Sequence, residues 1–133
     1  MGRIVAIGGG DLQSNLPINK YIVEMDKKNS HNFLFVGTAS GDAEGYIDNI
    51  KEAFEPLNCQ VKALCLTRKE CAQTEIDELL EWADIIYVGG GLVTRLMNAL
   101  KKTGADKVLI EAYNNGIIMS GNSAGGCVWY ESY

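Results

Sequence analysis

The sequence is organised around residues 117–126, which are Ile117-Ile118-Met119-Ser120-Gly121-Asn122-Ser123-Ala124-Gly125-Gly126. Three apolar residues, typical of the end of a buried strand, lead into a Gly-x-Ser-x-Gly pattern, and an amphipathic segment follows. This order predicts a nucleophile elbow, a strained strand-to-helix turn that projects the hydroxyl of its central serine. We therefore predict that Ser123 is a catalytic nucleophile.

Two glycines and one backbone amide fit the predicted elbow. Gly121 and Gly125 stand two residues either side of Ser123, where a Cβ would collide with the neighbouring turn. The N–H of Ala124 would lie unpaired at the start of the next helix and could bind an oxyanion. A glycine-rich turn without a catalytic role is the alternative explanation of the same pattern.

On the amino-terminal side of this stretch, apolar runs alternate with amphipathic segments. Strands are expected at residues 3–7, 32–36, 59–66, 84–88 and 117–119, and helices begin near residues 15, 42, 74, 93 and 105. This alternation predicts an α/β fold, with helices on both faces of a mainly parallel sheet. Residues 1–133 are expected to form a single domain, because the length suits one core and the chain contains no linker, repeat or low-complexity tract.

Glycine-rich or polar residues follow four of the expected strands, at 8–10, 37–40, 89–91 and 123. In parallel sheets, binding and catalysis concentrate at the carboxyl ends of the strands. We therefore expect the turn at Gly90 and Gly91 to share one small space with Ser123 and the Ala124 N–H. The first glycine run does not predict a dinucleotide site, because Gln13 stands where the last glycine of that motif is needed.

Bulk composition narrows the function classes. The net charge of −5 argues against nucleic acid or an anionic membrane as a partner. No apolar run is long enough to span a membrane and the N-terminus lacks signal-peptide anatomy, so a cytoplasmic protein is expected. Four cysteines without C-x-x-C spacing and a single histidine predict no metal site and no cofactor. That histidine, His31, is expected in a solvated loop at the amino end of the second strand.

Several motifs together resemble peptidase family S51, the group of peptidase E (aspartyl dipeptidase) and cyanophycinase. They are Val36-Gly37-Thr38-Ala39-Ser40, Ile85-Ile86-Tyr87-Val88-Gly89-Gly90-Gly91, Leu96-Met97, Gly104-Ala105-Asp106, Ala112-Tyr113 and Gly121-Asn122-Ser123-Ala124-Gly125 continuing to Trp129. The resemblance implies a three-layer α/β/α fold of the class I glutamine-amidotransferase-like type. It also implies a serine exopeptidase that takes small peptides and cleaves next to aspartyl residues. Ser123 would be its nucleophile, and the N–H groups of Gly90, Gly91 and Ala124 its oxyanion hole.

The chain departs from the family pattern in two places. Leu92-Val93 follows the triple glycine, where family members usually have Asn-Thr, and Tyr133 comes ten residues after Ser123, whereas the family's catalytic histidine and acid lie downstream of the serine. The chain is therefore expected to be the N-terminal part of a longer family domain and to be inactive by itself. A sheet cut short would expose an edge, which favours a homo-oligomer.

Two other functions remain open from the sequence. An esterase of the α/β-hydrolase type uses the same elbow, although it too needs a later acid and histidine. A non-catalytic binding or scaffold domain could retain the elbow as an element of the fold. Labelling by a fluorophosphonate separates the enzymes from the scaffold, and activity on Asp-X dipeptides or on short-chain esters separates the two enzymes.

Overall fold

The computed structural model describes residues 3–7, 16–26, 29–38, 41, 44–65, 73–89, 93–103, 105–114 and 116–122. Strands and helices alternate along the chain as the sequence predicts, and all five expected strands are present. In order, the elements are β1 (Arg3–Ile7), α1 (Leu16–Glu24), β2 (His31–Val36), α2 (Glu44–Phe54), the 3-10 helix η2 (Glu55–Leu57), β3 (Cys59–Leu64), α3 (Gln73–Trp82), β4 (Ile85–Val88), α4 (Val93–Thr103), α5 (Ala105–Asn114) and β5 (Ile118–Asn122).

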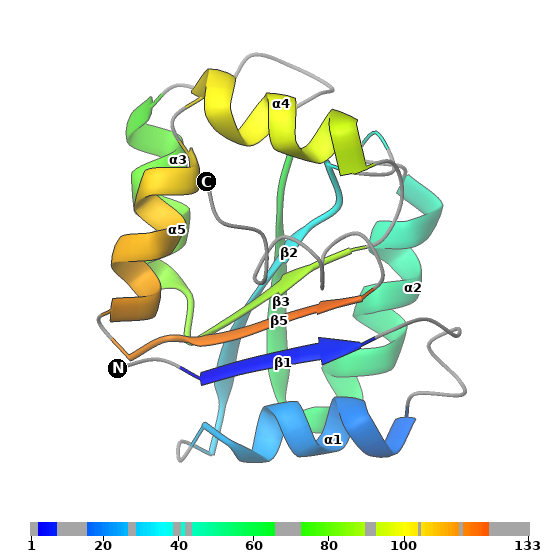
Figure 1. Ribbon diagram of the computed structural model, residues 1–133. Helices are drawn as coiled ribbons and strands as arrows, with labels where there is room; N and C mark the ends of the chain where they lie inside the picture. The colour runs from blue at the N-terminus through cyan, green and yellow to red at the C-terminus, as the bar shows by residue number, and fades with distance from the viewer. Residues whose placement is uncertain are drawn as a thin grey trace.

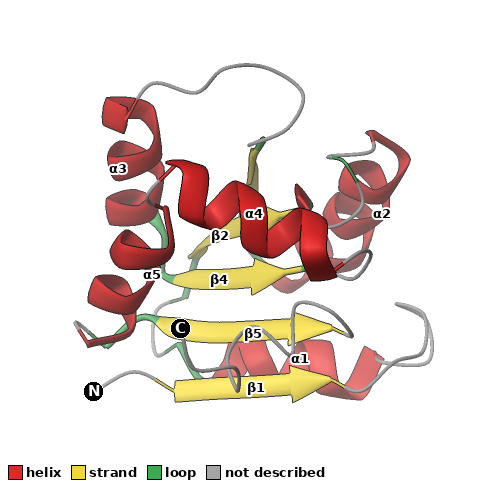
Figure 2. Ribbon diagram, turned by 45° about the horizontal axis from the view of Figure 1, so that its top comes forward, coloured by secondary structure: helices red, strands yellow, loops and turns green. Residues whose placement is uncertain are grey.

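The five strands form one sheet in the order β1-β5-β4-β2-β3, and every neighbouring pair is parallel (Figure 2). Strand β4 lies at the centre, and all four of its residues are buried. A strand that is apolar on both sides needs helices on both faces of the sheet, because either face would otherwise expose its side chains to water.

Two separate cores lie on the two faces of the sheet, which confirms the predicted three-layer arrangement (Figure 1). Helices α1 and α2 cover one face and bury an aromatic cluster made of Phe33, Phe35, Phe54 and Tyr87. Helices α3, α4 and α5 cover the other face, where the buried residues are aliphatic, namely Leu34, Val36, Leu64, Ile76, Leu80, Ala83, Ile86, Val88, Leu96, Leu100, Leu109 and Met119.

Proline and glycine end the helices where the sequence predicts. Helix α2 ends at Phe54 and the chain tightens into η2, which contains Pro56. Gly116 follows α5 with a φ of 92° and donates its N–H to the carbonyl oxygen of Tyr113, as a helix C-cap glycine does. None of the described helices has both the length and the apolar character that crossing a bilayer requires.

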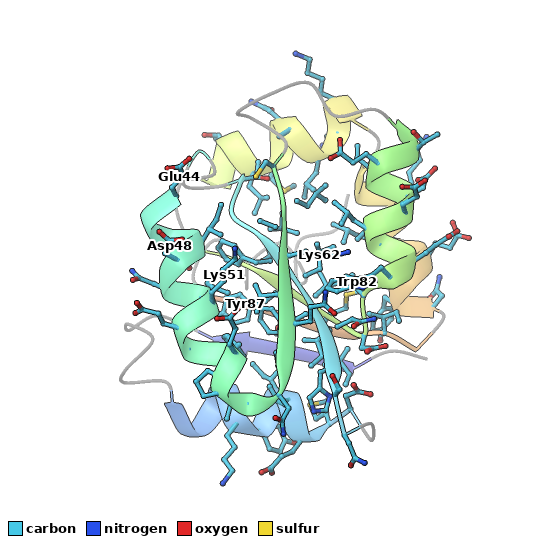
Figure 3. The ribbon with its side chains drawn as sticks, turned by 180° about the vertical axis from the view of Figure 1, so that it is seen from behind. Glu44, Asp48, Lys51, Lys62, Trp82 and Tyr87 are labelled. Atoms are coloured by element: carbon cyan, nitrogen blue, oxygen red, sulfur yellow. The ribbon has the colours of Figure 1, made fainter. Side chains whose placement is uncertain are left out.

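One edge of the sheet is the exposed side of β3. Lys62 extends from this strand and holds its Nζ 4.5 Å from the centre of the Trp82 ring at the end of α3 (Figure 3). A lysine on an edge strand discourages pairing with another chain, and its contact with the indole adds a cation–π attraction. The charge of Lys62 therefore opposes strand pairing at this edge, and its contact with Trp82 holds the side chain there.

Candidate active site

The carboxyl ends of β1, β5, β4 and β2 lie side by side at one edge of the sheet. Gly121 of β5 pairs with Val88 of β4, which pairs with Val36 of β2. The N–H of Gly89 donates to the carbonyl oxygen of Val36 at 2.9 Å, so pairing continues one residue beyond β4. Asn122 and Gly89 therefore end two neighbouring strands, which are about 4.8 Å apart in a sheet.

Most of the predicted site lies outside the described residues. This applies to Ser123, Ala124, Gly125, Gly90 and Gly91, so the elbow and its oxyanion hole stay predictions. Gly121 is described and lies in β5, paired with β1 on one side and β4 on the other. The structure thus brings together the residues that directly precede Ser123 and Gly90.

Strand β5 extends further than the sequence suggests. It includes Ser120, Gly121 and Asn122, residue types that are poor or neutral strand formers, whereas the expected strand stops at Met119. The position between β1 and β4 overrides this local preference, because β1 pairs with β5 as far as Asn122 and β4 pairs with it as far as Gly121. The buried hydroxyl of Ser120 is accommodated by donating to the carbonyl oxygen of Ile86 at 3.1 Å. As a result, the strand continues to the residue immediately before Ser123.

Two of the strand-end glycines have a packing role that the sequence does not reveal. A Cβ at Gly37 would lie 2.7 Å from Phe35 Cε2, and one at Gly89 would lie 2.8 Å from Phe35 Cε1. The Phe35 ring is fully buried and also packs against Tyr46 and Tyr87, with ring centroids 4.8 and 6.2 Å away. A side chain at either position would therefore have to displace this buried ring.

Thr38 is a buried polar residue at the same edge. It lies two residues beyond the end of β2 and is fully buried. Its carbonyl oxygen accepts the N–H of Gly41 at 2.9 Å, in a turn that gives Gly41 a φ of 71°. Its hydroxyl has no hydrogen-bond partner within the described part of the chain. In the sequence, Thr38 is recognisable only as part of a family motif, without a function of its own.

His31 lies at the amino edge as expected, but the expectation of a solvated loop is wrong. It is the first residue of β2 and is only 6% exposed. Its Nδ1 lies 2.6 Å from Oδ2 of Asp26, and its backbone N–H donates to the carbonyl oxygen of Asn58 at 2.9 Å. Packing of α1 against the sheet brings Asp26 back to the start of β2, and this contact cannot be predicted from local polarity.

His31 lies too far from the carboxyl edge to act on Ser123. Phe33, Ile85 and Ile118 form one row across β2, β4 and β5. His31 lies two residues before that row in β2, and Asn122 lies four residues after it in β5. At a rise of about 3.3 Å per residue, His31 and Asn122 are separated by roughly 20 Å along the strand direction. A general base has to lie within hydrogen-bond reach of its proton, so His31 is a structural residue.

We predict that His31→Ala lowers stability without impairing catalysis. The substitution leaves the part-buried Asp26 carboxylate without its partner, which costs about 1–3 kcal/mol of unfolding free energy. Urea unfolding measures this cost, and any catalytic rate of the protein is expected to stay within about twofold of the parent at a temperature where both are folded. A much larger loss of activity at full folding would show that His31 takes part in the chemistry after all.

Cys59, the register partner of His31 in β3, is not an activated nucleophile. Burial, with a further contribution from the nearby negative charge of Asp26, raises the pKa of its thiol from 9.0 to about 12. Thiol nucleophiles in enzymes have lowered pKa values, because the thiolate is the reactive form. The histidine, aspartate and cysteine at this edge therefore do not form a cysteine-based catalytic site.

A pocket of about 460 Å³ also opens at the amino edge. Its lining includes Lys20, Asp26, His31 and Asn58. The pocket lies at the end of the sheet opposite to Asn122, and ligands of parallel α/β sheets bind outside the carboxyl ends of the strands. We therefore place the candidate active site at the carboxyl edge and not in this pocket.

Comparison with known proteins shows which family the chain resembles. The sequence profile of peptidase family S51 matches residues 4–133 of the chain. The uncharacterized peptidase YgaJ of Bacillus subtilis strain 168 is 35% identical over 134 residues, a match that covers 98% of this chain and 57% of YgaJ. Peptidase E of Streptomyces coelicolor is 31% identical over 91 residues, which are 68% of this chain and 35% of that protein.

A solved structure shows the same fold. The crystal structure of a peptidase from an acI-B1 Actinobacterium superimposes with a TM-score of 0.78 at 25% sequence identity. The superposition covers 94% of this chain and 55% of that chain. The present chain thus spans little more than half the length of this peptidase and of YgaJ.

Proposed function

Because this chain belongs to peptidase family S51, we propose that it carries the nucleophile of a serine exopeptidase that hydrolyses small peptides next to aspartyl residues. The proposal rests on one observation above all. Strand β5 continues to Asn122, directly before Ser123, and runs beside β4, which Gly89-Gly90-Gly91 follow in the sequence. Nucleophile and oxyanion-hole donors would then come from neighbouring strands at one edge of the sheet.

In the proposed reaction, the Ser123 hydroxyl oxygen attacks the scissile carbonyl carbon and gives up its proton to a general base. The carbonyl oxygen becomes an oxyanion, which accepts hydrogen bonds from the N–H groups of Ala124 and of the Gly90-Gly91 turn. Collapse of this intermediate breaks the C–N bond, and the base returns its proton to the leaving amine. Water then hydrolyses the acyl-enzyme by the same steps and releases the serine.

The general base has to be a group other than His31, the single histidine of these 133 residues. We propose that it comes from the additional length that the relatives possess, together with the acid that orients it. The 133 residues alone are then expected to turn over Asp-X dipeptides poorly or not at all, because a serine hydroxyl without a base is a weak nucleophile.

Two alternatives are weaker. An α/β-hydrolase-type esterase would share the elbow, but the family match favours a peptidase. A non-catalytic scaffold would need neither Ser123 nor a shared edge for the two glycine-rich turns, and the alignment of β4 with β5 favours the enzyme over it.

The test uses the full-length protein with two substrate classes and a covalent probe. We expect hydrolysis of Asp-X dipeptides well above that of short-chain esters, and labelling of Ser123 by a fluorophosphonate, located by peptide mass spectrometry. Faster cleavage of esters would support the esterase. A folded protein that hydrolyses neither substrate and takes up no probe would support the scaffold.

A further inference from the structure

The pocket of about 460 Å³ at the amino edge lies at the end of the sheet opposite to Asn122. One wall is the carboxyl half of α1, and the other is η2 with the residue after it, Asn58. Figure 1 shows the carboxyl end of α2 reaching α1 at this edge. Val23 from α1 and Pro56 and Leu57 from η2 give the pocket an apolar part. Its volume lies in the lower part of the range for small-molecule sites, about 300–1,000 Å³, so it suits a small ligand.

His31 joins the two walls of this pocket. Its Nδ1 lies 2.6 Å from Oδ2 of Asp26, two residues after α1, and its backbone N–H donates to the carbonyl oxygen of Asn58. An ionised carboxylate only accepts, so Nδ1 carries the proton of this bond, and in the neutral ring Nε2 keeps a lone pair. Within the described part of the chain, Nε2 has no hydrogen-bond partner. The side chain is 8% exposed and lines the pocket, so the fold holds a fixed acceptor where a ligand can reach it.

Two charges of opposite sign lie on α1 beside this acceptor. Lys20 and Glu24 both line the pocket, and their spacing of four residues puts them on one face of the helix. Neither forms an ion pair with any residue that the structure describes. The carboxyl end of α1 adds partial negative charge, and its last turn contains no basic residue. The described lining thus offers negative groups and an acceptor beside the ammonium of Lys20.

We propose that this pocket is a second binding site and that it takes a free α-amino acid with an aliphatic side chain. The ligand's ammonium donates to Glu24 and to Nε2 of His31, and its carboxylate accepts from Lys20. Its side chain packs against the apolar part of the pocket. A simple amine would leave Lys20 unmatched, and a simple carboxylate would leave Glu24 and the acceptor unmatched. The inference does not depend on the proposed peptidase function.

The test is a titration of the full-length protein with L-leucine, followed through the backbone amide shifts in ¹H–¹⁵N NMR spectra. We expect saturable binding with a dissociation constant of about 1 mM or below, and shifts concentrated at the amides that line the pocket. N-acetyl-L-leucine lacks the ammonium and should bind at least about tenfold more weakly, because hydrogen bonds to charged groups are the strong ones. L-leucinamide lacks the carboxylate and should bind about 2–5-fold more weakly, because its missing partner, Lys20, is an exposed charge.

A double variant, Lys20→Gln with Glu24→Gln, tests the location. Both side chains are exposed, so the variant is expected to fold, and it should bind L-leucine about 5–20-fold more weakly than the parent. The matched control is Lys102→Gln with Glu78→Gln, the same changes at exposed positions of α4 and α3 on the opposite face of the sheet. The control should bind L-leucine within about twofold of the parent.

Three results would overturn the inference. The first is the absence of saturable L-leucine binding to the parent protein. The second is equal affinity for L-leucine and N-acetyl-L-leucine, because the ammonium would then make no contact. The third is unchanged L-leucine affinity in the double variant, which would place the ligand elsewhere on the protein. None of these results bears on Ser123, whose role is tested separately by hydrolysis of Asp-X dipeptides.

Discussion

If Ser123 is the nucleophile, as proposed, replacing it with alanine is expected to lower the kcat of peptide hydrolysis by roughly 10⁶-fold, the loss seen when a serine protease loses its nucleophile. The physical reason is that, in the proposed mechanism, the Ser123 hydroxyl is the group that forms the acyl-enzyme. Binding and the oxyanion hole would survive, so a small residual rate is expected and KM should change little. Initial rates on an Asp-X dipeptide measure the effect, with far-ultraviolet circular dichroism to verify the fold.

Ser120, which lies in β5 three residues before Ser123 in the sequence, offers a matched control. Its hydroxyl is fully buried and donates to the carbonyl oxygen of Ile86, so Ser120→Ala is expected to cost about 1 kcal/mol of stability. Its activity should stay close to that of the parent protein. If Ser120→Ala and Ser123→Ala lost activity equally, the effect would be structural, and Ser123 would lose its assignment as nucleophile.

The second large effect is a loss of stability when a side chain at Gly89 meets the ring of Phe35. Gly89→Ala would place a methyl group 2.8 Å from Phe35 Cε1, 2.9 Å from its Cζ and 3.0 Å from Tyr46 Cε2. The Phe35 ring is fully buried between neighbours and cannot move aside cheaply. We expect the substitution to lower the unfolding free energy by about 1–3 kcal/mol, the usual cost of overpacking a core. Urea denaturation with a constant m-value would measure it.

Two controls test the cause of this loss. At Gly45, in the first turn of α2, an added Cβ would meet no atom within 4 Å, so Gly45→Ala is expected to be neutral or slightly stabilising. Phe35→Leu removes the ring. In that background, Gly89→Ala should lower the unfolding free energy by clearly less than it does in the parent. We expect a coupling energy between the two substitutions of at least about 0.5 kcal/mol. Strict additivity of the two changes would show that the ring is not what excludes a side chain at Gly89.

Much of the fold follows from local patterns in the sequence. The run from Ile85 to Val88 is apolar at every position, which predicts a strand covered on both faces, and it is the fully buried centre of the sheet. Gly116 predicts the end of α5 because few residues other than glycine tolerate its φ of 92°. These predictions succeed because periodicity and backbone preference act over a few neighbouring residues.

The candidate site is less well determined by local patterns. The sequence places Ser123 after a strand and Gly90 after another strand, and parallel strands that end in turns suggest a common edge. It does not determine that β4 and β5 are neighbours, or that Asn122 and Gly89 end them at the same level. Those facts depend on the order of the strands in the sheet, which hydrogen bonding between distant segments decides.

By itself, the sequence determined the α/β class, the succession of strands and helices and the residue proposed as nucleophile, because each depends on a short pattern of residue types. Only the tertiary structure decided that His31 is buried against Asp26, that Phe35 crowds Gly37 and Gly89, and that the Thr38 hydroxyl has no partner among the described residues. Each of these depends on packing between elements brought together by the fold. Whether a side chain is exposed to solvent, tightly packed or without a hydrogen-bond partner depends on neighbours from other segments, and these cannot be read from the sequence around it.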